Sequence, residues 1–531
     1  MKHNNKHLLT TAAQAEGRLA LTRRGFLHRT AYTLGGALAT SGIYELIDTF
    51  SRPPARAAAS SFTFLPEQHL LQNVAVIMDD GSGTSSPNGT IAVMVPPLHH
   101  QIVTAKLNVD ATADALQEAQ EQLESAIKKL EEVYPQTPSG LGITVAWGLS
   151  YFQHYIPQLG KSSSHFQAGT SYPHYLPIDQ RASKAVGKPV QAILDAITFP
   201  SDQPPSGFPQ VILEQNDVVV LFRSDSLDHI TAGANALFGR GSDQVGELFT
   251  VTSIRKGFAG GGFYGGQGLP SQMALAANIP AADKIPPNAQ LFLGFTSTHQ
   301  AALGPSVICN LESLPGLTDQ WPHGYFRHGT TMHLSHLFED LQSWYEGNAS
   351  ANFSHFSDRV RASFRPGLHV SPSTRTVPED GTRVESEAAV IADLKTYGVV
   401  GHSASLQPAA RLQQATTDNY GNVYPAGTPI PQRADFNTLD NPFYYSANPD
   451  LDHSSSDPAA GLHFLVFPPT SDAFHRVRLA MDGHYPDGTR LNLSSRDFGM
   501  GFNAVLFTTH RQNFLVPPRA HRSFPLAEYL T

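Results

Sequence analysis

The sequence has almost no cysteine and few charged residues, and each shortage excludes a class of protein. Cys309 is the only cysteine among 531 residues. An intramolecular disulfide and any multi-cysteine cluster or zinc site are therefore excluded. Charged residues make up 15% of the chain and hydrophobic residues 40%. This balance is typical of a folded globular protein and not of a disordered one.

Long apolar runs are also missing from the body of the chain. A membrane span needs roughly 20 consecutive apolar residues, and no such stretch occurs. We therefore expect no stable span in the mature protein. The length is enough for two or more domains of roughly 100–200 residues. The chain's 43 glycines and 39 prolines indicate a loop-rich fold with many turns.

An excess of basic residues is absent as well. The formal net charge is −9, and removal of residues 1–59, which hold eight basic and three acidic residues, leaves −14. An acidic protein gains no affinity for phosphates by releasing counterions. We therefore expect no nucleic-acid partner.

The N-terminal region has the order of an export signal. Residues 22–27 (TRRGFL) contain paired arginines, a mildly apolar run follows at 31–43, and small residues end at 57–59 (AAA). This pattern predicts a twin-arginine signal peptide over residues 1–59. An anchor helix is the alternative, but the run is short and contains glycines. We expect the twin-arginine machinery to export the protein to the periplasm, the cell envelope or the exterior.

The first half of the mature chain alternates predicted strands and helices. The predicted strands are residues 73–78, 91–95, 141–147, 217–222 and 248–254, and the predicted helices are residues 116–134 and 226–237. Asp110 or Thr112 is available to cap the first helix, and Pro135 ends it. Ser226 caps the second helix. This alternation suggests helices packed on one face of an antiparallel sheet.

The second half repeats this plan less regularly. The predicted strands are residues 291–295 and 461–467, and the predicted helices are residues 333–345 and 471–481. The glycine-rich run 257–268 is interpreted as a connection, because no Lys-Ser/Thr follows it as in a phosphate-binding loop. The irregular stretches 365–385 and 415–460 are long enough to be functional or disordered. The two halves are candidates for pseudo-duplicates.

Three segments share an order with a known family: residues 293–298 (LGFTST), residues 329–344, and the set 401–403 (GHS), 431–435 (PQRAD) and 461–467 (GLHFLVF). They resemble the dye-decolorizing (DyP-type) peroxidase superfamily, whose members are haem proteins. The resemblance implies an α+β fold of two ferredoxin-like halves, each an antiparallel sheet with helices on one face, as in dimeric α/β-barrels. The halves would be residues 60–265 and 286–531. Residues from 511 onward have no counterpart in the family.

The resemblance also implies a chemistry and its residues. The protein would bind haem b (iron protoporphyrin IX) in the second half, reduce hydrogen peroxide and oxidise a small organic electron donor. His402 would be the axial ligand of the haem iron, as neutral imidazole is in other peroxidases. Arg433 would stabilise the charge that develops as the peroxide bond breaks. From the residues alone, His402 also fits a core or loop histidine, and Arg433 a surface arginine.

One position departs from the family pattern. Ser297 stands where the family has its catalytic aspartate, and a hydroxyl without a partner cannot accept a proton at neutral pH. His299 is the candidate substitute, because an unperturbed imidazole titrates at about 6.5. If His299 does not face the pocket, the alternative is a catalytically impaired exported protein that keeps the fold and binds haem or a metal.

The abundance of histidine suggests a rival metal site. The chain has 24 histidines, and His323, His328, His333 and His336 fall within fourteen residues. His333 and His336 would be neighbours on one face of the predicted helix, where they could bind zinc or copper. The apolar residues of that helix compete for the same face. We therefore expect most of the surplus histidines in loops and on the surface, and Cys309 to be a small buried apolar residue.

Overall fold

The computed structural model describes most of the chain after residue 40. The described residues are 41–51, 63–77, 93–156, 175–202, 210–259, 261, 267–287, 289–294, 300–346, 386–398, 400, 402–442, 457–492 and 505–531. The chain divides into two units, Met1–Ala39 and Thr40–Thr531, and all described residues belong to the second. Among them, no helix combines the length and the apolar character that crossing a bilayer requires.

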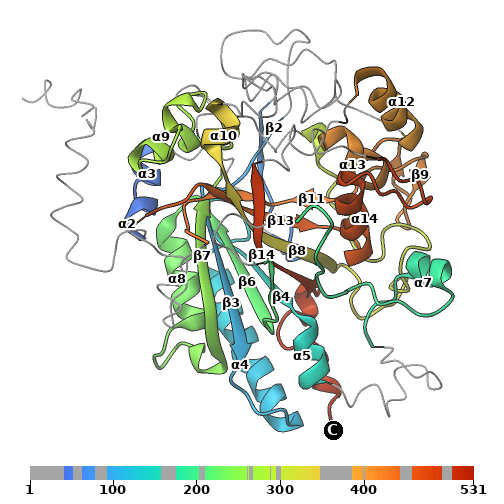
Figure 1. Cartoon of the computed structure of the whole chain (residues 1–531). Coiled ribbons are helices and arrows are strands. Elements are labelled where there is room, and N and C mark those ends of the chain that lie inside the picture. Colours follow the sequence, from blue (N-terminus) through green and yellow to red (C-terminus); the bar gives the residue numbers. More distant parts are fainter. Residues whose placement is uncertain are drawn as a thin grey trace, which may run out of the picture. The chain divides into compact units, whose positions relative to one another are not determined.

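Strands and helices alternate through this second unit (Figure 1). The strands are β1 (Ala75–Ile77), β2 (Val93–Val95), β3 (His99–Leu107), β4 (Gly142–Trp147), β5 (Ile212–Leu213), β6 (Val218–Ser224), β7 (Phe249–Phe258), β8 (Thr330–Glu339), β9 (Thr416–Thr417), β10 (Val423–Tyr424), β11 (Gln432–Arg433), β12 (Phe436–Thr438), β13 (Gly461–Phe467) and β14 (Leu506–Val516). The α-helices are α2 (Ser41–Tyr44), α3 (Ile47–Phe50), α4 (Ala113–Val133), α5 (Leu149–His154), α7 (Gln180–Val186), α8 (Leu227–Phe238), α9 (Leu269–Ala276), α10 (Leu341–Glu346), α12 (Glu387–Tyr397), α13 (His402–Ala410) and α14 (Ser471–Met481).

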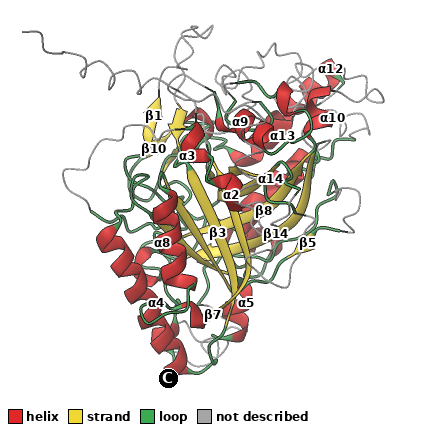
Figure 2. Cartoon of the chain, turned by 90° about the vertical axis from the view of Figure 1, so that its left-hand side faces the viewer, coloured by secondary structure: helices red, strands yellow, loops and turns green. Residues whose placement is uncertain are grey.

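The first half is a ferredoxin-like unit. Its elements follow in the chain as β3, α4, β4, β6, α8 and β7, and its antiparallel strands lie in the order β7–β3–β6–β4. The first and third strands are therefore central, and a helix follows each of them. Figure 2 shows α4 and α8 together on one side of these strands.

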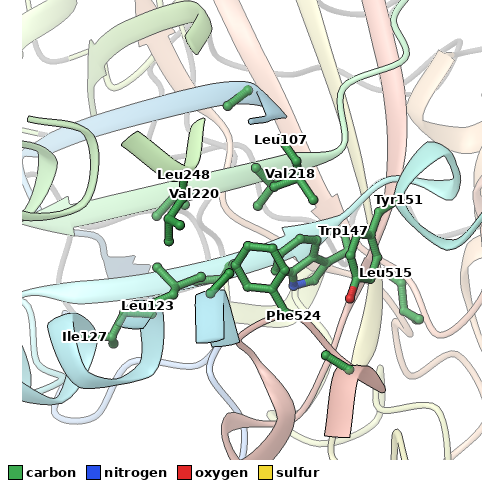
Figure 3. Packing of buried hydrophobic residues seen from close by; sticks show 14 of the residues in the cluster. Leu107, Leu123, Ile127, Trp147, Tyr151, Val218, Val220, Leu248, Leu515 and Phe524 are labelled. Atoms are coloured by element: carbon green, nitrogen blue, oxygen red, sulfur yellow. The ribbon is translucent and has the colours of Figure 1, made fainter. Parts of the chain in front are cut away.

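Local sequence explains the two helices of this half. Thr112 caps α4 and Ser226 caps α8, each by accepting a hydrogen bond from a backbone N–H in the first turn. The apolar stripe of α4 includes Leu123 and Ile127, which are fully buried against the sheet. Trp147 from β4 and Phe524 from the C-terminal segment fill the other end of this core (Figure 3). The predicted caps and the predicted inward face of α4 are confirmed.

The second half repeats the unit. Its strands follow in the chain as β8, β12, β13 and β14, with α10, α12 and α13 after β8 and α14 after β13. The strand order is β14–β8–β13–β12, all antiparallel. The first and third strands are again central. The predicted α+β class with two ferredoxin-like halves is confirmed, whereas the residue limits of the halves stay a prediction.

The two sheets join edge to edge into a closed ring. Asn437 of β12 pairs with Phe258 of β7 on one side, and Leu515 of β14 pairs with Trp147 of β4 on the other. Each seam has only one residue pair in register, so side chains must supply further bonds. At the seam between β4 and β14, Gln68 donates to the carbonyls of Val145 and Pro517, 2.8 Å each. Its Oε1 accepts from the Val145 N–H at 2.8 Å.

We expect Gln68→Ala to destabilise the protein by about 2–4 kcal/mol. The side chain is fully buried, and its loss leaves backbone groups on both sides of the seam without partners at about 1–3 kcal/mol each. Urea denaturation measures the change. Gln122→Ala is the matched control, because Gln122 bonds only the exposed Glu118 on α4. A Gln68 variant as stable as this control would contradict the bracing role.

The structure corrects two predicted elements of the second half. Residues 333–339 form most of strand β8 instead of a helix, and only α10 is helical. β8 lies between β13 and β14 and is buried on both faces, so its apolar residues carry no strand period. Residues 291–294 are a turn, not a strand. Side chains bond their backbone: Tyr345 donates to the Phe292 carbonyl and Trp344 to the Leu293 carbonyl.

Two long strands, β3 and β14, lie in stretches for which no element was predicted. β3 begins at the histidine pair His99 and His100 and is central to the first half. β14 includes residues 511–516, the start of the C-terminal stretch that has no counterpart in the resemblance, and it pairs with β8 along ten residues. The start of this stretch is thus part of an integral strand of the second half. The glycine-rich run also begins inside β7, which extends to Phe258.

Candidate functional site

The structure places two of the four predicted site residues in defined elements. His402 is the first residue of α13, although its side chain lies outside the described residues. Arg433 is the last residue of β11. Ser297 and His299 lie outside the described residues, so their predicted roles stay predictions. The candidate site is therefore built from α13, β11 and the sheet face that Arg433 shares.

Arg433 lies on the outer face of the second sheet, with helix α14. It pairs with Val466 of β13, and Val466 packs against Phe474 of α14. The guanidinium Nε of Arg433 is buried and has no hydrogen-bond partner among the described residues. A buried donor without an acceptor is costly. Arg433 therefore offers a position at which a bound anionic or polar group would be stabilised.

Asp435 lies two residues beyond Arg433 on the same face. Side chains alternate along a strand, and the intervening Ala434 packs with the apolar cluster inside the ring. Asp435 and Arg433 are both half-buried, so solvent reaches both. The charge of Asp435 acts on a neighbouring carboxyl group. Burial, together with that charge, raises the pKa of Glu339. A cation and a carboxylate, two residues apart, thus share one half-buried face of the chain where β11 leads into β12.

A buried histidine network supports this face from the neighbouring strands. His333 of β8 has one ring nitrogen 2.7 Å from the Asn513 Oδ1 and the other 2.6 Å from the Ser335 Oγ. Its ring stacks on Phe474 at 3.6 Å between centroids. Burial and the charge of Arg511 lower its pKa well below the usual value. His333 is therefore a neutral structural residue at physiological pH.

Charged residues form the rest of this sheet face beneath α14. Arg511 of β14 donates two hydrogen bonds to Asp202, both at 2.7 Å. Arg478 of α14 lies 3.6 Å from the same carboxylate. Both guanidinium groups lie over the Phe199 ring, at 4.9 and 5.1 Å from its centroid. These contacts attach the chain segment before residue 202 to β14 and α14, and they make this part of the face rigid.

The helix that begins at His402 is tied to the strand of Arg433. Helix α13 packs against α14 and α12, and the N–H of Ile430 donates to the carbonyl of Ala410 at 3.0 Å. That bond joins the end of α13 to the chain just before β11. His402 occupies the N-terminal end, roughly 12 Å away along the helix axis.

The other histidines do not behave as predicted. Several are buried in the sheets instead of lying in loops: His99, His100, His333, His336, His463 and His510. Histidines three apart on a strand point to opposite faces, so His333 and His336 do not form the predicted metal-binding pair. His336 instead lies inside the ring, 4.4 Å from His463 between ring centroids. Within the described ranges, no group of three or more metal-ligating residues is assembled.

Cys309 is buried, as its interpretation as a small apolar residue requires. Its sulfur lies 3.6 Å from the His69 Nε2. Burial raises the pKa of Cys309 to about 12, and burial lowers the pKa of His69 to about 4. The pair is therefore a neutral thiol beside a neutral imidazole. It lacks the thiolate that a nucleophilic cysteine needs.

Comparison with protein families identifies the chain's relatives. Residues 188–518 match the model of a family of unknown function, DUF7405. The chain belongs to this family. The match covers the end of the first ferredoxin-like unit and most of the second, including α13 and β11. No curated protein matches the sequence.

Solved structures similar to this DUF7405 member include DyP-type peroxidases. One, from Cellulomonas bogoriensis, has 14% identity and a TM-score of 0.44, over 86% of this chain and 96% of the other. The encapsulated enzyme from Mycobacterium smegmatis has 11% identity and a TM-score of 0.41, over 81% and 96%. A DypB variant from Rhodococcus jostii RHA1, in complex with heme, has 11% identity and a TM-score of 0.42, over 81% and 96%.

Asp435 is the site residue that sequence reasoning missed. It lies within the quoted segment 431–435, beside Arg433, but was given no role. The signal that identifies it is the strand period, which places residues two apart on one face. The prediction of a helix over residues 333–345 hid that face, because it removed β8 from the sheet.

Proposed function

We propose that this DUF7405 protein is a haem-dependent peroxidase of the DyP type, which reduces hydrogen peroxide and oxidises a small organic donor. The observation that carries the proposal is the buried Nε of Arg433, which has no hydrogen-bond partner among the described residues and lies on the face shared with Asp435. With the start of α13 at His402, this donor would hold the haem. Bound haem would supply the redox-active iron.

The chain's own residues would divide the remaining work. His402 would hold the iron with a neutral imidazole. Arg433 would stabilise negative charge on a peroxide oxygen. The Asp435 carboxylate would accept a proton from the inner peroxide oxygen and return it to the leaving oxygen as general acid. Asp435 thereby takes the role that Ser297 cannot perform, and His299 remains a second candidate for it.

Haem binding is tested by the absorption of protein purified from haem-replete cells. We expect a Soret band in the wild-type protein and its loss in His402→Ala, because the iron loses its axial ligand. His154→Ala is the matched control, since His154 is exposed on α5. A wild-type protein without a Soret band, or a His402→Ala variant that keeps it, would overturn the proposal.

Catalysis is tested by peroxide-dependent dye oxidation in variants that retain haem. We expect Arg433→Ala to lose about 10²–10³-fold in turnover, as removal of one preorganised charge-stabilising donor does. Asp435→Asn should lose about 10²–10⁴-fold, because an amide accepts no proton. Arg240→Ala, at an exposed position after α8, should keep full activity. Bound haem without turnover in the wild type would support the impaired haem-binding alternative instead.

We also propose that the protein is exported by the twin-arginine machinery. The paired arginines and the apolar run that follows them support this location. Replacement of Arg23 and Arg24 by lysine should retain the protein in the cytoplasm. Fractionation of cells that express the full chain measures the effect.

A further inference from the structure

Residues 41–50 pack into the core of the protein, although they fall inside the export signal predicted over 1–59. Ile43, Tyr44 and Ile47 expose at most 7% of their surface. They join an apolar cluster that also contains residues of α9 and Trp344 of α10. A cleaved signal peptide is absent from the mature protein, so its residues are not expected to be part of the hydrophobic core.

The Tyr44 hydroxyl is bonded into a seam of the sheet ring. It donates to the Asp440 Oδ1 at 2.8 Å and accepts from the Leu439 N–H at 3.0 Å. The other oxygen of Asp440 accepts from the Lys256 N–H at 2.7 Å. These groups lie where β12 meets β7, the seam with a single residue pair in register. Tyr44 thus braces this seam as Gln68 braces the other.

A second contact ties the segment to the neighbouring strand. Asp48 of α3 lies 2.8 Å from the Nε2 of His99, which begins β3. Loss of residues 41–50 would therefore leave Asp440, His99 and the Leu439 N–H without these partners. Unmet buried polar groups of this kind destabilise a fold.

The sequence offers a cleavage pattern just before this segment. Residues 37–39 are Ala-Leu-Ala, the small-x-small pattern that signal peptidases recognise after an apolar region. The paired arginines lie upstream of it, as do residues 31–36 of the mildly apolar run. The compact unit that contains the fold begins at Thr40, directly after this pattern.

We propose that the export signal is cleaved after Ala39, so that the mature protein begins at Thr40 and keeps α2 and α3 as a brace of the seam between β7 and β12. Under this proposal the signal ends at Ala39 and not at the small residues 57–59. This inference rests on the proposed export, but it does not depend on peroxidase activity.

The cleavage site is tested on the full chain, expressed in a bacterium with twin-arginine machinery. N-terminal sequencing and intact mass of the exported protein should give Thr40 as the first residue. Ala39→Tyr should leave uncleaved precursor, whereas Ala59→Tyr should be processed normally. An exported protein that begins after residue 50, or at Met1, overturns the cleavage site. Protein found only in the cytoplasm overturns the export on which it rests, and dye oxidation is scored separately.

The bracing role has its own readout in thermal unfolding of the exported protein. Tyr44→Phe and Ile47→Asp should each lower the Tm, because the first loses the hydroxyl bonds and the second places a charge in the core. Glu45→Ala is the control, since Glu45 is exposed on the same segment. Unchanged Tm values in both variants would overturn the bracing role, whatever the N-terminus is.

Discussion

Glu339→Gln is expected to make the protein more stable than the wild type as the pH rises. Glu339 ends β8 and exposes only 2% of its surface. Burial and the charge of Asp435 raise its pKa to about 8, whereas the unfolded chain keeps the ordinary value of about 4.5. Between these two values the folded state holds a proton that the unfolded state has released. The stability of the wild type therefore falls as the pH rises through this window.

The expected size follows from this linkage. Relative to the glutamine variant, the wild type should lose about 3–5 kcal/mol of unfolding free energy between pH 5 and pH 9. The amide stays neutral, so the variant lacks this loss. Urea denaturation of both proteins at pH 5, 7 and 9 measures the difference. Other titrating groups, including the buried histidines, are common to both proteins and cancel.

The control replaces an exposed glutamate. Glu121 lies on the solvent side of α4, and Glu121→Gln should follow the wild-type pH dependence. A constant stability difference between Glu339→Gln and the wild type from pH 5 to 9 would contradict a proton held on Glu339.

Arg522→Met is expected to cost about 3–5 kcal/mol of stability at neutral pH. The Arg522 guanidinium exposes 1% of its surface and donates to two carboxylates of α4, Glu124 and Glu131, at 2.6–3.1 Å. Removal of one partner from a buried ion pair leaves buried charge incompletely compensated, because Glu131 then keeps only its pairing with Arg519. Methionine retains the apolar volume of the arginine side chain, so the loss of stability reports the loss of the charge. Urea denaturation at pH 7 measures it.

The matched control uses the same acceptor. Lys128 lies 3.7 Å from Glu124, but its side chain is 67% exposed. An exposed pair contributes about 0–1 kcal/mol, so Lys128→Met should be nearly neutral. If both variants cost the same, the C-terminal segment is not held to α4 through Arg522.

Much of the fold could be predicted from local sequence. Thr112 and Ser226 cap the two helices of the first half where they were predicted to, because capping and apolar spacing act within one or two turns. The alternating strands and helices of that half therefore indicated helices packed on one face of an antiparallel sheet, and the resemblance implied the ferredoxin-like unit. The resemblance extended the plan to the second half, and the strand order confirms it.

The second half was harder to predict because its strands are buried on both faces. In β8, Leu334 and Leu337 fit a helical spacing as well as a strand. Only the pairing with β13 and β14 decides between them. The turn at 291–294 is similar, since its backbone is satisfied by the distant side chains of Trp344 and Tyr345.

The candidate site also combines residues that were identified from the sequence with one that only the structure identified. Arg433 and His402 were identified by resemblance of short segments; they lie in β11 and α13, and their roles stay predictions. Asp435 became visible only when β11 and β12 were seen to continue one another along β13. The histidine count was misleading, because burial in the sheets, not metal binding or exposure, accounts for many of the histidines.

By itself, the sequence determined the capped helices, the lack of intramolecular disulfides and the acidic charge, while the export signal stays a prediction from it. These properties depend on neighbouring residues or on composition. The tertiary structure alone decided that β14 closes the ring, that Tyr44 braces its seam and that Glu339 holds a proton near neutral pH. Each of these depends on groups that are hundreds of residues apart or on burial. A chain acquires such contacts and its local dielectric only when it folds.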